Sequence, residues 1–314
     1  MKIKMKEEYL TTELRSAIIK TIVFFDLFNY PLTRWEIWQN LPIKIELIEL
    51  EKALDELITQ EKTIELYNGF YFLAGRQDLF CIRQKRYNYT NHKIKIARWA
   101  SYLFRLLPSV KLVAVSNLIG HHNLRDESDI DIFIISSPRR LWLTRFFCTG
   151  LMKLANMRPN SKRKRNKICL SFYASVDGLA MENLRFTPHD PYFDHWFLGL
   201  YPIYEKDNLL AFLRFKNDWL KGAFPNSLLL KDTFPDNYFH RSWSEWIFFG
   251  WGDLLNWCTK KIQMLIMPKR MRELAAADAG VLISDTVLRF YMNDRRAEFY
   301  KNYHDCLAKL DIYE

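Results

Sequence analysis

Apolar residues recur at helical spacing over the first sixty positions of the chain. The first such stripe predicts a helix that ends near Asn29-Tyr30-Pro31. A second helix is expected to begin at Thr33, because Thr33 and Glu36 have the spacing of a capping box. The stripe of the first helix consists of Leu14, Ile18, Ile22 and Phe25, and that of a third helix consists of Leu47, Leu50, Leu54, Leu57 and Ile58.

Two short strand-like runs follow the third predicted helix. They cover residues 63–66 and 70–73 and flank Asn68-Gly69, a dipeptide that strongly favours a tight hairpin. Three helices followed by a hairpin are the elements of a winged-helix domain in their usual order. We therefore predict a winged-helix-like domain over residues 1–80.

The third predicted helix is acidic on its solvent side. In DNA-binding domains of this type that helix enters the major groove and needs positive charge to meet the phosphates. The excess of acidic over basic residues on this helix repels a DNA duplex, so DNA binding is disfavoured. A structural or protein-binding role is preferred, and a DNA-binding regulator remains an alternative. The acids are Glu46, Glu49, Glu51, Asp55, Glu56 and Glu61, against Lys44, Lys52 and Lys62.

The pattern then changes to a mixture of strands and helices. A basic helix, expected to be solvated, connects the domains over 81–107; the alternative is that its charges lie beside an anionic ligand of the next domain. Strands are predicted at 110–115, 129–135 and 168–175, and a helix at 139–157, within a second domain at 108–190. Beyond this domain, the pattern predicts a helical region over residues 191–314, with helices at 209–220, 243–267 and 295–310. Its core is expected to contain Trp219, Trp243, Trp246, Trp251 and Trp257.

Composition narrows the class of protein. The formal net charge of +10 gives weak support to an anionic partner. Five scattered cysteines are typical of reduced thiols in a cytoplasmic protein, and the first residues contain no apolar segment of a secretory signal. The apolar stretch 243–267 is interrupted by four charges. We therefore expect no membrane span and no membrane partner.

The pair Asp129 and Asp131 carries the chemistry that the sequence predicts. Residues two apart on a strand project to one face, so both carboxylates point one way while Ile130 and Ile132 point into the core. Two adjacent carboxylates repel each other unless a cation lies between them, and Mg²⁺ suits oxygen ligands. The alternative interpretation is a solvated pair of acids at the exposed start of a strand.

The surroundings of this pair favour the first interpretation. A strand, Ser116-Asn117, a short segment containing glycine, and then Ser128-Asp129-Ile130-Asp131 follow in order. This arrangement resembles the DNA polymerase beta-like nucleotidyltransferase superfamily, in particular its minimal nucleotidyltransferase branch. The stretches 25–33, 140–145 and 288–296 also look like a bacterial subgroup of that branch with an N-terminal winged helix. The implied fold is α+β, with a central mixed sheet and flanking helices.

The resemblance implies a reaction and a set of roles. Members transfer a nucleoside monophosphate from an NTP to an acceptor hydroxyl, and Asp129 and Asp131 would hold Mg²⁺. Ser116 and Asn117 would contact the triphosphate at the N-terminus of a helix. Further nucleotide-binding positions are expected at Ser128, Arg140 and Arg145.

Two departures from the family pattern keep an alternative function open. The family has Gly-Ser where this chain has Ser116-Asn117, and active members carry a third carboxylate on a later strand that is lacking at 168–175. Candidate positions for the third ligand are Ser171, Asp177 and Asp190. The alternative to an active enzyme is a nucleotide-binding or scaffold protein that is weakened or inactive in catalysis.

Overall fold

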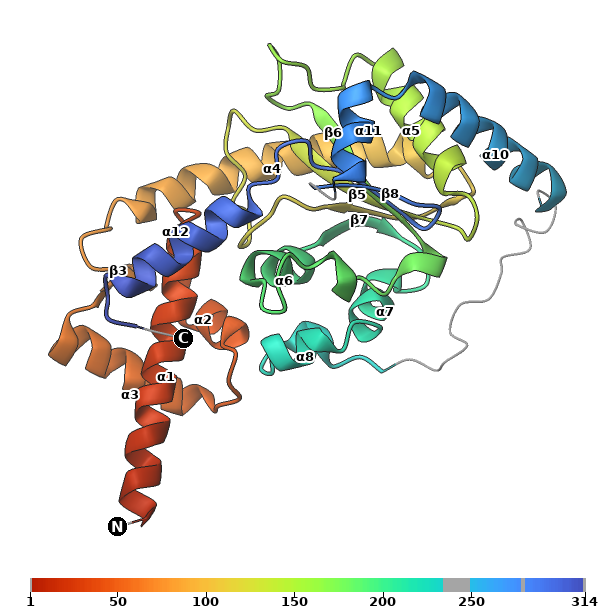
Figure 1. Ribbon diagram of the computed structural model, residues 1–314. Helices are drawn as coiled ribbons and strands as arrows, with labels where there is room; N and C mark the ends of the chain where they lie inside the picture. The colour runs from red at the N-terminus through yellow and green to blue at the C-terminus, as the bar shows by residue number, and fades with distance from the viewer. Residues whose placement is uncertain (1, 234–248, 278–279, 313–314) are drawn as a thin grey trace.

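The computed structural model describes residues 2–233, 249–277 and 280–312. The N-terminal part of the chain forms the small helical unit at the lower left of Figure 1. Three antiparallel strands in the order β1-β3-β2 complete this unit. The predicted three helices and hairpin are confirmed in type and order, and the structure adds the short strand β1 and a π-helical turn. The elements are α1 (Lys2–Asp26), β1 (Leu32–Thr33), α2 (Arg34–Asn40), α3 (Leu47–Glu56), the π-helical turn η1 (Leu57–Glu61), β2 (Ile64–Tyr67) and β3 (Phe70–Leu73).

Local sequence signals account for the boundaries of this unit. The Thr33 hydroxyl accepts a hydrogen bond from the backbone N–H of Glu36 at 3.2 Å, and the Glu36 carboxylate accepts one from the backbone N–H of Thr33 at 2.8 Å. This is the predicted capping box. Asn68 and Gly69 have φ angles of 50° and 82°, as a tight hairpin turn with a positive φ at both central residues requires.

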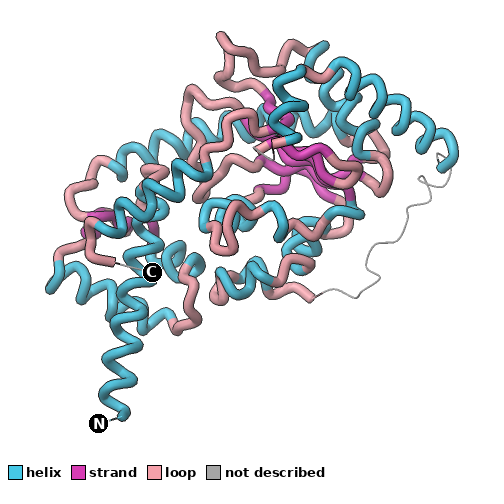
Figure 2. Tube along the Cα trace, viewed as in Figure 1, coloured by secondary structure: helices cyan, strands magenta, loops and turns pink. Residues whose placement is uncertain are grey.

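A mixed sheet forms the centre of the molecule (Figure 2). It has six strands in the order β7-β4-β5-β6-β9-β8. Strands β5 and β6 are parallel, and the other neighbours are antiparallel. The strands are β4 (Val110–Val115), β5 (Ile130–Ser136), β6 (Ile168–Ser175), β7 (Tyr201–Glu205), β8 (Val281–Ile283) and β9 (Val287–Phe290). The bounds predicted for β4 and β6 are confirmed.

The region predicted to be helical beyond residue 190 supplies half of this sheet, which corrects that prediction. Strand β7 pairs with β4, and β9 pairs with β6. These strands are three to five residues long. Runs this short have no readable periodicity, and pairing with an existing sheet edge decides their conformation.

Helices cover both faces of the sheet (Figure 1). One face carries α6 (Pro191–Leu198), α7 (Leu209–Phe215) and α8 (Trp219–Ala223), with α12 (Arg296–Ala308) packed along α1. The other carries α4 (Leu79–Phe104), α5 (Leu141–Leu154), α10 (Phe249–Ile266) and α11 (Lys269–Ala276). Single 3₁₀ turns form η2 (Val176–Gly178), η3 (Glu182–Leu184) and η4 (Leu228–Leu230).

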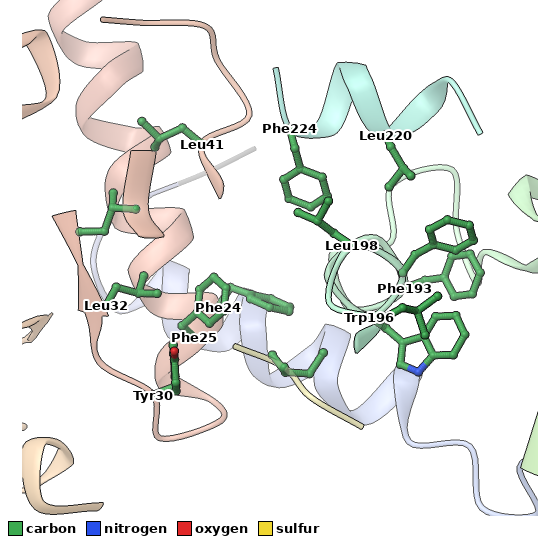
Figure 3. Close-up of a cluster of buried hydrophobic side chains, with 14 of the residues drawn as sticks. Phe24, Phe25, Tyr30, Leu32, Leu41, Phe193, Trp196, Leu198, Leu220 and Phe224 are labelled. Atoms are coloured by element: carbon green, nitrogen blue, oxygen red, sulfur yellow. The ribbon is translucent and has the colours of Figure 1, made fainter. Parts of the chain in front are cut away.

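Alternation along β5 divides the apolar side chains between two cores. Phe133 and Ile135 join the core beneath α6, whereas Ile132 and Ile134 join the core beneath α5. The first core continues into the N-terminal unit, because Phe24 of α1 packs in the same cluster as the apolar residues of α6 and α8 (Figure 3). This shared core joins the N-terminal unit to the sheet.

The tryptophans do not share one environment. Trp219 stacks on Phe193 and is packed against the core, as expected. Trp251 and Trp257 are 73% and 56% exposed on α10, which contradicts the prediction that they are core residues. Trp243 and Trp246 lie outside the described residues. Among the described residues, every helix is too short or too polar to cross a lipid bilayer.

His195 is a partly buried histidine, packed among aromatic rings, that makes stability depend on pH. Its ring stacks on Phe24 at 4.0 Å, and its Nδ1 lies 2.8 Å from the Pro191 carbonyl. Burial lowers the pKa of His195 to about 4. Since the unfolded chain binds this proton at a higher pH, the neutral histidine contributes full stability above pH ~6.5, and that stability is lost as pH falls toward 4.

We therefore expect His195→Phe to make the free energy of unfolding depend less on pH between pH 7 and pH 4. The free energy of unfolding of the wild type should fall by up to about 3 kcal/mol more than that of the variant between pH 7 and pH 4. Urea unfolding at a series of pH values measures this difference. A difference between wild type and variant that does not change with pH would contradict the assignment.

Candidate functional site

Two carboxylates and a thiol converge at one edge of the central sheet. One ligand atom from each of Asp129, Asp131 and Cys169 lies within 4.8 Å of the others. Asp131 is on β5, and Cys169 is directly opposite it on β6. Ile130 and Ile132 are fully buried in the core on the opposite face. The predicted alternation along this strand is therefore confirmed.

An irregularity in the pairing of β5 with β6 adds side chains to this edge. Asp131 pairs with Cys169, but Phe133 pairs with Phe172, so β6 has one residue more than β5 between these pairs. A bulge of this kind re-aims neighbouring side chains. As a result Cys169, Ser171 and Phe172 all line the same cavity. The Ser171 hydroxyl is buried there and has no hydrogen-bond partner.

The electrostatic environment at this end of β5 and β6 disfavours ionisation of both carboxyl groups, Asp129 and Asp131, when no cation is bound. Burial and the neighbouring charge of Asp129 raise the pKa of Asp131 to about 7. Burial also raises the pKa of Asp129, although the Lys164 and Lys93 ammonium groups oppose the shift. Burial and the two carboxylates raise the pKa of the Cys169 thiol, so it stays protonated and hydrogen-bonds to Asp131. The carboxylate pair therefore favours a bound proton or cation.

A cavity of about 570 Å³ opens beside the carboxylates. This volume falls in the usual range for small-molecule sites, ~300–1,000 Å³. Its far wall is the segment that follows β9 into α12, so residues far apart in the sequence form one site. Positive charge predominates among its lining residues. The lining arginines are Arg86, Arg125, Arg289, Arg295 and Arg296, and the lining carboxylates are Asp129, Asp131 and Asp294.

Ser116 and Asn117 line this cavity, but the helix expected after them does not form. Residues 116–129 are an irregular loop. Leu118 is buried in the core beneath α5 and Ile119 in the core beneath α6. Two adjacent residues that pack on opposite faces require an extended chain, because a helix would turn them by only ~100°. The prediction of a helix N-terminus at Ser116 is wrong.

These two residues instead hold the start of β5 in place. The Ser116 backbone N–H donates to the Asp131 carbonyl at 2.9 Å, and its hydroxyl donates to the same carbonyl at 3.3 Å. The Asn117 amide donates to the Asp129 carbonyl at 3.2 Å. The Asn117 Oδ1 is buried without a hydrogen-bond partner.

The prediction of a solvated basic helix holds for only part of α4: Lys85, Lys95 and Arg98 are exposed, but two other basic residues are buried. The Lys93 ammonium is buried and donates to the Asp126 and Ser128 carbonyls at 3.0 and 2.6 Å. Arg86 is also buried and donates to the Asn123 side chain at 2.7 Å. Both residues therefore anchor the loop that leads to Asp129. Ser128 lines the cavity, and its hydroxyl donates to the Arg125 carbonyl at 2.9 Å.

Four predicted positions lie away from the cavity. Arg140 forms an ion pair with Asp253, and Arg145 donates to Gln263, both across the contact of α5 with α10. Asp177 follows β6 at the end remote from Cys169. Asp190 caps α6 by accepting from the backbone N–H of Phe193 at 3.0 Å. Neither Asp177 nor Asp190 joins the carboxylate pair as a third ligand.

Sequence reasoning missed the far wall of the cavity. Asp294 lines it, but Arg296 binds this carboxylate at 2.6 Å. Burial alone would raise the pKa of Asp294, and the hydrogen bonds from Arg296 lower it overall. The run 281–290, with apolar residues on both sides of Ser284-Asp285, was the available signal for a hairpin that leads to these residues.

Comparison of the chain with protein-family models, curated proteins and solved structures finds no match.

Proposed function

We propose that this protein is a Mg²⁺-dependent nucleotidyltransferase that moves a nucleoside monophosphate from an NTP to an acceptor hydroxyl. In this proposal the sheet with β4, β5 and β6 is a nucleotidyltransferase domain, and the N-terminal unit is a winged helix. The supporting observation is that Asp129 and Asp131 converge on a cavity lined by five arginines. Paired carboxylates beside guanidinium groups suit a metal-bound triphosphate.

The residues at the sheet edge fit Mg²⁺. This ion is commonly held by one or two carboxylates together with waters and substrate phosphates. Asp129 and Asp131 supply the carboxylates, and the unpartnered Ser171 hydroxyl supplies a further oxygen nearby. The Cys169 thiol is a poor ligand for a hard cation, and it orients Asp131 instead. Bound Mg²⁺ would neutralise phosphate charge and lower the pKa of an attacking hydroxyl.

In this proposal, some of the other residues that line the cavity bind the triphosphate and others contact the ribose and base. Arg125 is exposed at the cavity, and Arg289 enters it from β9. Guanidinium groups at these positions bind phosphate oxygens and hold the triphosphate against the carboxylates. Tyr192 and Phe299, stacked on each other at 5.1 Å, provide an apolar wall for the ribose and base.

A nucleotide-binding protein without turnover is the second candidate. It is favoured by Cys169, a protonated thiol at the position on β6 where a third carboxylate would meet the pair. A thiol with a raised pKa neither binds Mg²⁺ well nor serves as a general base near neutral pH. This candidate shares the cavity and its ligand with the first and differs from it in chemistry alone.

The test combines binding with turnover in the full chain. Each NTP is titrated with Mg²⁺ by calorimetry, and pyrophosphate release is followed with small alcohols, proteins and RNA ends as acceptors. Asp129→Asn with Asp131→Asn should lose both signals, whereas Asp126→Asn, an acid outside the cavity, should keep them. Binding without release of pyrophosphate supports the second candidate. Absence of Mg²⁺-dependent NTP binding in the wild type rejects both.

Substitutions at Arg125 and Arg140 distinguish the site that the structure places at the cavity from the site that the family resemblance implies. We expect Arg125→Ala to weaken Mg-NTP binding by about ten- to a hundredfold, because one charge-assisted hydrogen bond contributes ~1.5–3 kcal/mol. Arg140→Ala should leave the affinity unchanged, since Arg140 is paired with Asp253 away from the cavity. Calorimetric dissociation constants measure both effects. The reverse ranking would show that the nucleotide binds elsewhere.

A further inference from the structure

Helix α10 packs on the protein through its polar side. Its Asn256 side chain accepts a hydrogen bond from the Leu143 backbone N–H at 3.0 Å. Its Gln263 side chain donates to the Trp142 carbonyl at 2.8 Å. Asp253 of α10 forms the ion pair with Arg140. Gln263 is buried, so the inner side of this helix is held by polar contacts with α5.

The outer side of α10 is apolar. At ~100° per residue, six of the seven exposed apolar residues described on this helix fall within an arc of about 120°, and the seventh, Trp257, lies about 60° beyond it. Two of them, Trp251 and Leu265, are 73% and 83% exposed. We call these six residues the outer face; they are Trp251, Leu254, Leu255, Ile262, Leu265 and Ile266. A helix of a soluble protein ordinarily has the opposite orientation, with the apolar stripe on the core.

Helix α5 carries further exposed apolar residues. It lies beside α10 at the periphery of the molecule (Figure 1), and residues at its N-terminal end contact α10. Phe146, Phe147 and Leu154 of α5 are also exposed. Exposed apolar residues gathered on one helix face and on a neighbouring helix mark an interaction site in proteins more often than scattered single residues do.

Exposed basic residues lie on and next to the helices that carry these apolar residues. Lys261 lies on α10 beside Trp257, and the exposed Lys269, Arg270 and Arg272 follow on α11. Arg139 precedes α5 and Lys153 lies in its last turn, and both are exposed as well. The nearby acids Asp253 and Glu273 are each within an ion pair. The apolar surface is therefore bordered by net positive charge.

We propose that the outer face, with the exposed residues of α5, binds the surface of a membrane that contains anionic phospholipid. An apolar arc with tryptophan and a basic border is the pattern of a helix that lies in the plane of the lipid headgroups. The basic border complements anionic lipid, whereas two copies of this chain would bring like charges together across the same surface. Binding to a membrane surface requires no helix that spans the membrane. The proposal therefore differs from the sequence-based prediction only in giving the protein a membrane partner.

The test uses the full chain and vesicles of defined composition. Sedimentation is measured with vesicles of phosphatidylcholine alone and of phosphatidylcholine with phosphatidylglycerol. The variant Leu254→Glu with Leu265→Glu changes two exposed positions of the outer face. The matched control, Ile48→Glu with Leu66→Glu, adds the same charge at exposed apolar positions of the N-terminal unit, remote from α10. Circular dichroism and light scattering follow folding and oligomeric state.

Binding of the wild type should require phosphatidylglycerol and should weaken as salt is added. The variant of the outer face should bind at least about tenfold more weakly, while the control binds like the wild type. The proposal is overturned if the wild type does not sediment with anionic vesicles, or if both variants bind equally. It is also overturned if the wild type is a dimer that the outer-face variant dissociates, because the surface is then an interface between copies.

Discussion

Asp131→Asn is expected to stabilise the metal-free protein at pH 8 and to abolish its response to Mg²⁺. Burial and Asp129 raise the pKa of Asp131 to about 7. Because the folded pKa lies above the unfolded value, stability from the protonated carboxyl is lost as pH rises through 7. The neutral amide avoids that cost, so the free energy of unfolding should rise by about 2–4 kcal/mol.

Thermal unfolding with and without Mg²⁺ measures both halves of this result. Mg²⁺ should raise the melting temperature of the wild type, since a ligand that binds only the folded state stabilises it by mass action. It should leave Asp131→Asn unchanged. Asp126→Asn serves as the control because Asp126 pairs with Arg165 outside the cavity and should keep the wild-type response. A destabilised Asp131→Asn that still responds to Mg²⁺ would contradict this account of the site.

Arg83→Met is expected to lower the free energy of unfolding by about 3–5 kcal/mol, because it leaves a buried carboxylate unpaired. Arg83 of α4 donates to both oxygens of Glu36 on α2, at 2.8 and 2.9 Å. Tyr30 donates to the same carboxylate at 2.6 Å and accepts from the His121 backbone N–H at 2.9 Å. This network joins the N-terminal unit to the loop beside Gly120. Burial opposes ionisation of Glu36, and the bonds from Arg83 lower its pKa overall.

Chemical denaturation compares this variant with two others. Arg15→Met breaks an exposed ion pair with Glu61 and should cost no more than ~1 kcal/mol. Adding Glu36→Gln to Arg83→Met should recover part of the loss, since no charge then remains buried without a partner. Equal effects of Arg83→Met and Arg15→Met, or no recovery in the double variant, would show that the network does not carry this stability.

Local patterns predicted much of the fold because their physical causes are local. The capping box at Thr33 and the turn at Asn68-Gly69 depend on neighbouring residues, and both form as expected. The alternation at Asp129 and Asp131 depends on strand geometry alone, and it places both carboxylates on one face. The helix expected after Ser116 fails because Leu118 and Ile119 pack on opposite faces of the sheet, which is a tertiary constraint.

The sequence by itself determined the helices of the N-terminal unit, α4, α5 and α12, the longer strands and the pair of carboxylates, because short-range geometry and hydrophobic periodicity decide these features. The tertiary structure decided what meets that pair. Cys169 arrives through the register of β6, Ser171 through a bulge, and Arg289 through a strand that pairs with β6 from more than a hundred residues away. It also decided that α10 turns its polar side inward, because hydrogen bonds to α5 are available there. Such pairings depend on partners remote in sequence, so no local pattern records them.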